Sequence, residues 1–230
     1  MKIGGSSGAC PSPAIGSVCA PDNGRSTTLI LALDSSTANC TAALFGADGT
    51  LLDARDELIG RGHAERLVPM IEELLAGRRA SNILVGVGPG SFTGLRVALA
   101  AAHGMAIGWS AELFGMPSLA LLAASAPGDG PVAAAMTGGH GELFVQSFER
   151  LPFAETSDAV NVPPAVAAAT TAEPLVVGSG AEALVAARGS GEAMMLVPSA
   201  RFALRLPPVL RRLPARPLYL RAPDATPKAA

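Results

Sequence analysis

Gly86-Val-Gly-Pro-Gly-Ser-Phe-Thr-Gly-Leu-Arg96 is the stretch of sequence on which the fold assignment depends. The apolar run Ile83–Val87 leads into it, which is typical of a buried strand. The small apolar residues that follow predict a helix over about Thr93–Trp109. Glycines permit positive φ and close backbone approach, and Ser91 or Thr93 can cap a helix. The stretch therefore predicts a tight strand-to-helix turn.

Two phosphate-binding motifs can be tested against this turn by their spacing. The P-loop requires a lysine after its last glycine, but Gly94 is followed by Leu95. The dinucleotide-binding pattern requires a third glycine where Ser91 stands. Neither cradle is present, although free amides at a helix start attract anions in general. A structural turn and a turn that faces a ligand or partner both stay open.

The surrounding segments predict an α/β chain that opens with three strands in a meander. An Asp-Gly pair between the second and third strands is a strong hairpin signal. Apolar residues at helical spacing then predict a helix with one apolar face. The predicted strands are Thr28–Leu33, Thr41–Phe45 and Leu51–Arg55, and the predicted helix is His63–Leu75.

The second half of the chain repeats this outline more weakly. Strands are predicted at Val132–Met136, Glu142–Phe148 and Leu175–Val177, and the last of them ends at Gly178-Ser-Gly180 before a helix. No internal repeat is visible as sequence identity. Both halves nevertheless share paired strands followed by a glycine-rich strand-to-helix turn.

Composition limits the classes of function. The chain has 230 residues, of which 49% are hydrophobic and 16% charged, with a formal net charge of −2. This balance argues against a broad basic surface that holds nucleic acid by itself. The exception is Arg201–Arg221, with six arginines and no acidic residue. A solvated segment and a contact with RNA or an acidic partner are both open there.

Polar residues and Pro117 interrupt the apolar stretch Val97–Ala126, which argues against a membrane span.

Residues 1–27 are rich in Gly, Ser, Pro and Ala and predict a disordered extension. They lack the apolar core of a signal peptide. The three cysteines, Cys10, Cys19 and Cys40, suggest no disulfide framework, so a reducing cytoplasm is the expected location.

Asp34 is the first candidate for chemistry, because it ends a predicted buried strand and precedes small hydroxyl residues. Such a carboxylate can hold a metal–phosphate complex, or it can form a hydrogen-bonded turn. A weak nucleotide contact is therefore considered at Asp34, Ser36, Gly90 and Ser91. No metal site is expected at His63, because Leu67 stands where a second imidazole would be needed.

Four pieces of the sequence resemble the TsaB family, the dimerisation subunit of the bacterial tRNA threonylcarbamoyladenosine machinery. The most specific piece is the string Gly88–Arg96, and together the pieces span about residues 28 to 224. The other three pieces are Ile30–Thr37, His63–Ile71 and Pro217–Asp224. The turn Met136–Glu142 departs from the family, whose members usually show an Asp-Ala-Arg-like string there.

The resemblance implies an α/β fold of the actin, Hsp70 and sugar-kinase type, with two related halves, each with a mixed sheet and helices. We expect these halves at residues 28–109 and 110–224, followed by a tail at 225–230. The implied role is a non-catalytic subunit that binds and organises the catalytic paralogue TsaD. The ATPase TsaE would join the complex, and tRNA would be reached through it. No cofactor is firmly implied; ATP or ADP at the partner interface and a homodimer stay open.

The expected interface uses the helix His63–Leu75 and the helix entered through Gly90–Arg96. Its expected apolar anchors are Leu67, Met70 and Ile71, with Glu65 and Arg66 setting the register at the rim. His63, Phe92 and Arg96 complete the candidate set. The alternative hypothesis is a small ATPase or kinase of the same fold that uses Asp34 and the glycine-rich turns. A peptidase ranks third, because no nucleophile set is visible.

Overall fold

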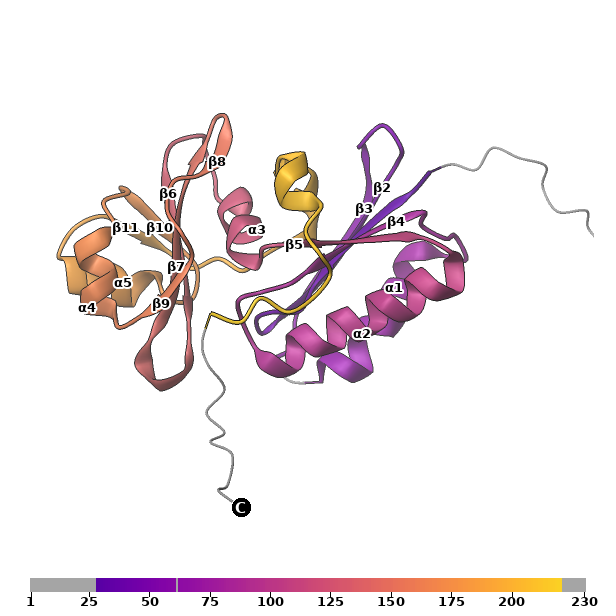
Figure 1. Ribbon diagram of the computed structural model, residues 1–230, viewed down its shortest axis with the longest axis horizontal. Coiled ribbons are helices and arrows are strands. Elements are labelled where there is room, and N and C mark those ends of the chain that lie inside the picture. The colour runs from indigo at the N-terminus through magenta and orange to yellow at the C-terminus, as the bar shows by residue number, and fades with distance from the viewer. Residues whose placement is uncertain (1–27, 61, 221–230) are drawn as a thin grey trace, which may run out of the picture.

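The computed structural model describes residues 28–60 and 62–220, which form two mixed sheets with helices (Figure 1). The expected extension at 1–27 and tail at 225–230 lie outside the described residues. The first half contains β1 (Ile30–Asp34), β2 (Asn39–Phe45), β3 (Leu51–Leu58), α1 (His63–Leu75), β4 (Asn82–Gly86), α2 (Phe92–Trp109) and β5 (Glu112–Met116).

The first sheet has the strand order β3-β2-β1-β4-β5. The predicted meander is confirmed, because β1, β2 and β3 pair antiparallel, whereas β4 and β5 add in parallel. Alternate residues of β1 point to opposite faces: Leu31 and Leu33 pack under α1 and α2, and Ala32 packs toward the other half. One face of this sheet thus carries α1 and α2 side by side, and the other meets the rest of the molecule (Figure 1).

The second half repeats the same topology. Its sheet has the order β11-β10-β6-β7-β8, with β9 also paired to β7. Strands β6, β10 and β11 run parallel, as β1, β4 and β5 do. The elements are α3 (Ser118–Ser125), β6 (Val132–Thr137), the 3-10 turn η1 (Gly139–Gly141), β7 (Leu143–Arg150), β8 (Phe153–Glu155), β9 (Val160–Val162), α4 (Pro164–Thr170), β10 (Leu175–Val177), α5 (Ala181–Arg188) and β11 (Glu192–Met194). The expected fold of the actin, Hsp70 and sugar-kinase type, with two related halves, is confirmed.

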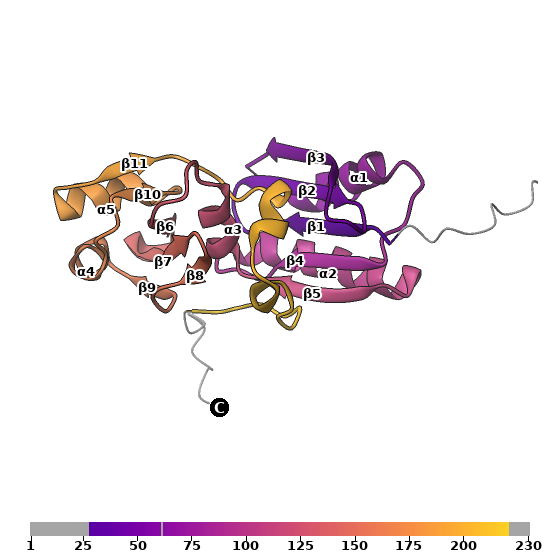
Figure 2. The ribbon, with the colours of Figure 1, turned by 90° about the horizontal axis from the view of Figure 1, so that it is seen from above.

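The first half extends beyond the expected limit at residue 109. Strand β5 follows that limit and pairs in parallel with β4, from Asn82 opposite Glu112 to Gly86 opposite Met116. After β11 the chain returns to the first half through two 3-10 turns, η2 (Ala200–Arg205) and η3 (Pro208–Arg211), which Figure 2 shows next to the first sheet. The two halves therefore share a core built on the buried helix α3.

Helix α1 begins at His63, so Pro69 is its seventh residue rather than part of its first turn. The proline ring removes one helix donor and leaves the carbonyl of Glu65 without its usual partner. Both residues are exposed, so water can satisfy that carbonyl. Within residues 28–60 and 62–220, no helix combines the length and the apolar character that crossing a bilayer requires.

Candidate functional site

The glycine-rich motif packs against the turn that follows β1. The amide of Ser91 donates to the carbonyl of Ser36 at 2.7 Å, and the hydroxyl of Ser35 donates to the carbonyl of Gly94 at 2.8 Å. A Cβ on Gly90 would overlap the Ser36 carbonyl, and one on Gly94 would overlap the Ser35 carbonyl. These glycines therefore allow two backbone turns to touch. The turn thus has a structural role within the chain.

Asp34 lies at the centre of this contact and is almost fully buried, with 1% of its surface exposed. Its Oδ1 accepts from the amide of Ser36 at 2.8 Å and from the Ser36 hydroxyl at 2.7 Å. Its Oδ2 accepts from the Ser118 hydroxyl at 2.6 Å. The Ser118 oxygen in turn accepts from the amide of Gly88 at 3.2 Å. The carboxylate thus joins the ends of β1 and β4 to the start of α3.

Burial raises the pKa of Asp34, although its three hydrogen bonds oppose that shift. Gly86 lies so close behind Oδ2 that an added Cβ would overlap it. Both carboxylate oxygens are occupied within the protein, which favours the hydrogen-bonded turn over the metal–phosphate role. In the described part of the chain, no three His, Cys, Asp or Glu side chains gather as a metal site.

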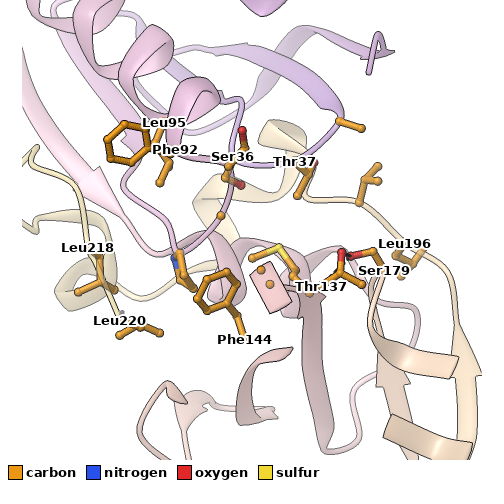
Figure 3. Close-up of a pocket in the computed structure, with 18 of the residues that line it drawn as sticks. Ser36, Thr37, Phe92, Leu95, Thr137, Phe144, Ser179, Leu196, Leu218 and Leu220 are labelled. Atoms are coloured by element: carbon orange, nitrogen blue, oxygen red, sulfur yellow. Dashed lines mark hydrogen bonds between the residues drawn. The ribbon is translucent and has the colours of Figure 1, made fainter. Parts of the chain in front are cut away.

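A cleft of about 880 Å³ lies between the two halves. Figure 3 shows Ser36 and Phe92 on one side of it, and Thr137, Phe144 and Ser179 on the other. Three residues considered for nucleotide contact, Ser36, Gly90 and Ser91, line the cleft, whereas Asp34 does not. No charged side chain of the described residues lines it. A phosphate group there would have only hydroxyls and backbone amides to bind.

The three expected apolar anchors are buried inside the chain's own core. Leu67 and Met70 have no exposed surface, and Ile71 retains 2%. They pack against the first sheet together with residues of α2. The prediction that they anchor a partner is therefore wrong. Helical spacing identified the apolar face of α1 correctly but could not say whether a sheet or a partner covers it.

The polar candidates on α1 have different positions. The Nε2–H of buried His63 donates to the carbonyl of Thr37 at 2.8 Å, which fixes the start of the helix. Arg66 donates to Glu57 of β3 at 2.6 Å and to Glu73 at 2.8 Å, which ties α1 to the sheet. This guanidinium lowers the pKa of both carboxyl groups. Only Glu65 is exposed and has no such bond.

The outward side of the α1–α2 pair exposes two large apolar side chains that the sequence interpretation did not single out. Val68 is 53% exposed on α1, and Ile107 is 82% exposed on α2. Ala100 and Gly104 lie two turns and one turn before Ile107, respectively, and are also exposed, so α2 is thin there. We refer to Glu65, Val68, Ala100, Gly104 and Ile107 as the outer helical face. Helical spacing held little signal for this exposure, because Val68 lies seven residues before Leu75, at the margin of the apolar stripe of its helix.

Phe92 and Arg96 face the C-terminal segment. The Arg96 guanidinium lies 3.6 Å from the centre of the Phe92 ring, and that ring lies 5.9 Å from the ring of Tyr219. The amide of Leu218 donates to the carbonyl of Val87 at 2.7 Å, which holds the segment against the motif. Phe92 and Tyr219 remain about half exposed. The motif therefore supports a stacked aromatic and cationic surface at the mouth of the cleft.

Comparison with known proteins places this geometry in a family. A family model described as TsaD, tRNA N6-adenosine threonylcarbamoyltransferase, matches residues 56–199. The tRNA threonylcarbamoyladenosine biosynthesis protein TsaB of Escherichia coli is 36% identical over 129 residues. This chain belongs to the TsaB family. The match to the E. coli TsaB covers 53% of this chain and 55% of that protein, so it spans about half of each.

Two further relatives extend the coverage. An uncharacterised protein of Mycobacterium tuberculosis is 32% identical over 219 residues, which are 87% of this chain and 95% of that protein. A crystal structure from Pseudomonas aeruginosa, described as an uncharacterised protein with similarity to peptidase YeaZ, aligns with a TM-score of 0.72 at 29% identity. That alignment covers 84% of this chain and all of the other. The TsaB family fold thus extends over both halves.

Proposed function

We propose that this chain is a non-catalytic subunit that binds and activates a TsaD-like threonylcarbamoyltransferase. The complex would form threonylcarbamoyladenosine in tRNA, at the adenosine next to the anticodon. The name of the E. coli relative supports the pathway, and the match to the TsaD family model supports a paralogous partner.

The non-catalytic role is supported by the hydrogen bonding of the Asp34 carboxylate and by the uncharged lining of the cleft. Phosphoryl transfer depends on metal ions and cationic side chains that neutralise the phosphates. Here the carboxylate that could hold a metal has both oxygens bonded to Ser36 and Ser118, and the described lining of the cleft contains no charged side chain. The scaffold role therefore explains this site better than an ATPase or kinase role does.

The outer helical face is the proposed interface with the partner. Val68 and Ile107 take the anchoring role first expected of the buried residues, because exposed apolar side chains gain most from being covered. Glu65 lies at the rim of this face, and Phe92 and Arg96 lie at the start of α2 beside it. A TsaE-like ATPase, and ATP or ADP, would join at the boundary between the two proteins. A homodimer through the same face is the competing assembly.

Reconstitution with the catalytic paralogue tests this proposal. This chain and the TsaD-like protein of the same host are co-expressed, purified through a tag on one of them, and assayed for threonylcarbamoyl transfer to tRNA. We expect co-purification, transfer that requires both proteins, and no ATP hydrolysis by this chain alone. Transfer at full rate without this chain, or ATP turnover that Asp34→Asn abolishes, would contradict the proposal.

A further inference from the structure

The arginine-rich C-terminal segment has two different environments. Arg201 donates to Asp56 at 3.1 Å, and Arg205 donates to the carbonyl of Ala124 at 3.2 Å, so both hold the segment to the fold. Arg212 and Arg216, further along, are exposed and form no side-chain hydrogen bond or ion pair with another described residue. Arg201 and Arg205 therefore have a structural role, whereas Arg212 and Arg216 are free to bind another molecule.

The C-terminal segment that carries Arg216 runs alongside α2. The carbonyl of Ala215 accepts from the Nε2–H of His103 at 3.1 Å. Four residues further along the segment, the ring of Tyr219 contacts the ring of Phe92. Arg96 lies between these two points, because Phe92, Arg96 and His103 share one side of the helix at spacings of four and seven residues. Arg216 follows Ala215 directly. Arg96 and Arg216 therefore lie along the edge where the segment and the helix meet.

This edge carries positive charge without compensation. Neither α2 nor residues 200–220 contain an aspartate or a glutamate. Arg96 also forms no ion pair within the described residues, unlike Arg55 and Arg66, which are paired. The potential along this edge is therefore positive even though the whole chain has a net charge of −2.

The aromatic rings decide what kind of anion fits. Phe92 and Tyr219 are 54% and 51% exposed, and the Arg96 guanidinium is stacked on the Phe92 ring. Exposed rings beside arginines are how proteins hold unpaired bases, by stacking on the base and pairing the phosphate. An acidic peptide would use the arginines but would have no use for the ring faces.

We propose that the edge formed by Phe92, Arg96, Arg216 and Tyr219 binds an unpaired segment of nucleic acid. Tyr219 and Phe92 stack on bases, and Arg96 and Arg216 bind the phosphates on either side. Under the proposed function, the unpaired segment is supplied by the tRNA, so this chain contacts the tRNA directly rather than only through its partner.

Fluorescence anisotropy with the full-length chain and no partner protein tests this inference, so its outcome does not depend on the scaffold role. The probe is a fluorescein-labelled single-stranded RNA, titrated over a range of salt concentrations. We expect binding whose affinity falls with salt. Arg96→Gln and Arg216→Gln each lower the slope of log affinity against log salt by about 0.7. Tyr219→Ala weakens binding by about fivefold or more, with little change in that slope.

Arg79→Gln is the matched control, because Arg79 is an exposed arginine near the amino end of β4, away from the motif at its carboxyl end. The inference is overturned if the wild-type chain does not bind the RNA, or if the control weakens binding as much as Arg96→Gln does. Tighter binding of polyglutamate or of duplex RNA than of the single strand would also overturn it. All four altered side chains are exposed, and circular dichroism verifies that each variant is folded.

Discussion

Gly94 and Gly104 occupy the same helix, but only Gly94 is packed so closely that a larger residue would not fit. A Cβ on Gly94 would overlap the Ser35 carbonyl, whereas a Cβ on Gly104 would meet nothing within 4 Å. We predict that Gly94→Ala lowers the free energy of unfolding by about 2–3 kcal/mol, because the two turns must separate. Gly104→Ala should raise it by about 0.5–1 kcal/mol, because alanine reduces the entropy of the unfolded chain. Urea denaturation of both variants measures the difference.

Gly104→Ala also serves as the control for helix propensity within α2. If Gly94→Ala were neutral or stabilising, the close packing of the motif on the β1 turn would not be the reason for its glycines.

The charge on Asp34 gives a prediction about pH. Burial raises the pKa of this carboxyl in the folded state above its ordinary value of 3.8. The folded protein then binds more protons than the unfolded chain between those two pKa values, so stability falls as pH rises through that window. An asparagine side chain at this position could not titrate. We therefore predict that the unfolding free energy of Asp34→Asn, relative to wild type, increases as the pH rises above about 4.

Denaturant titrations of both proteins at a series of pH values provide the measurement. Asp34→Asn also alters the hydrogen bond to Ser118, so only the trend with pH is diagnostic. A difference that stays constant or decreases with pH would show that the carboxyl is not destabilised by its burial.

The local sequence contained part of this site. The spacing around Gly94 excluded both standard phosphate cradles, and a hydrogen-bonded turn was one of the two roles that the sequence left open for Asp34. The partner of each glycine could not be predicted, because Ser35 and Gly94 are separated by 59 residues along the chain. Only the parallel pairing of β1 with β4 brings them together.

At the scale of elements, α1 has two faces with opposite energetic roles. Leu67 is fully buried under the helix, whereas the next residue, Val68, is 53% exposed. We predict that Leu67→Ala lowers the free energy of unfolding by about 2–5 kcal/mol, because it leaves a cavity in the core. Val68→Ala should change it by no more than about 0.5 kcal/mol. Thermal or urea unfolding of the isolated chain compares them, and equal effects would contradict the orientation of the helix.

Most elements could be predicted from periodicity, and their limits shifted by only a few residues. The helix predicted from Thr93 begins at Phe92, and the strand predicted at Leu51–Arg55 continues to Leu58. Short strands in Ala- and Thr-rich sequence, such as Phe153–Glu155, could not be predicted, because three residues carry no detectable period. The interface anchors were misassigned for a related reason, since an apolar stripe looks the same under a sheet and under a partner.

At the scale of the molecule, both halves use glycine to pack a turn closely against a backbone carbonyl. In the second half Gly178 lies where an added Cβ would overlap the carbonyl of Ala135 in β6. The amide of Gly180 donates to that same carbonyl at 3.0 Å, as Ser91 donates to Ser36 in the first half. The outline shared by the two halves therefore reflects a shared topology that sequence identity no longer reveals.

The assembly of the halves was less predictable than their internal order. The family resemblance gave the fold, but the position of β5 depends on its pairing with β4 across α2, and the return of the C-terminal segment depends on the contact of Leu213 with Gly115. Neither contact leaves a local pattern. The cleft and its uncharged lining arise from this arrangement, so they could be seen only in the structure.

Native mass spectrometry of this chain mixed with its TsaD-like partner tests the central claim most directly. The wild-type chain should form a complex with the partner. Val68→Asp combined with Ile107→Asp should lose that complex while remaining folded, because it places charges at the proposed anchors on the outer helical face. Val166→Asp, at a 49% exposed valine on α4, is the matched control and should retain it. An intact complex with the double variant, or its loss with the control, would contradict the account.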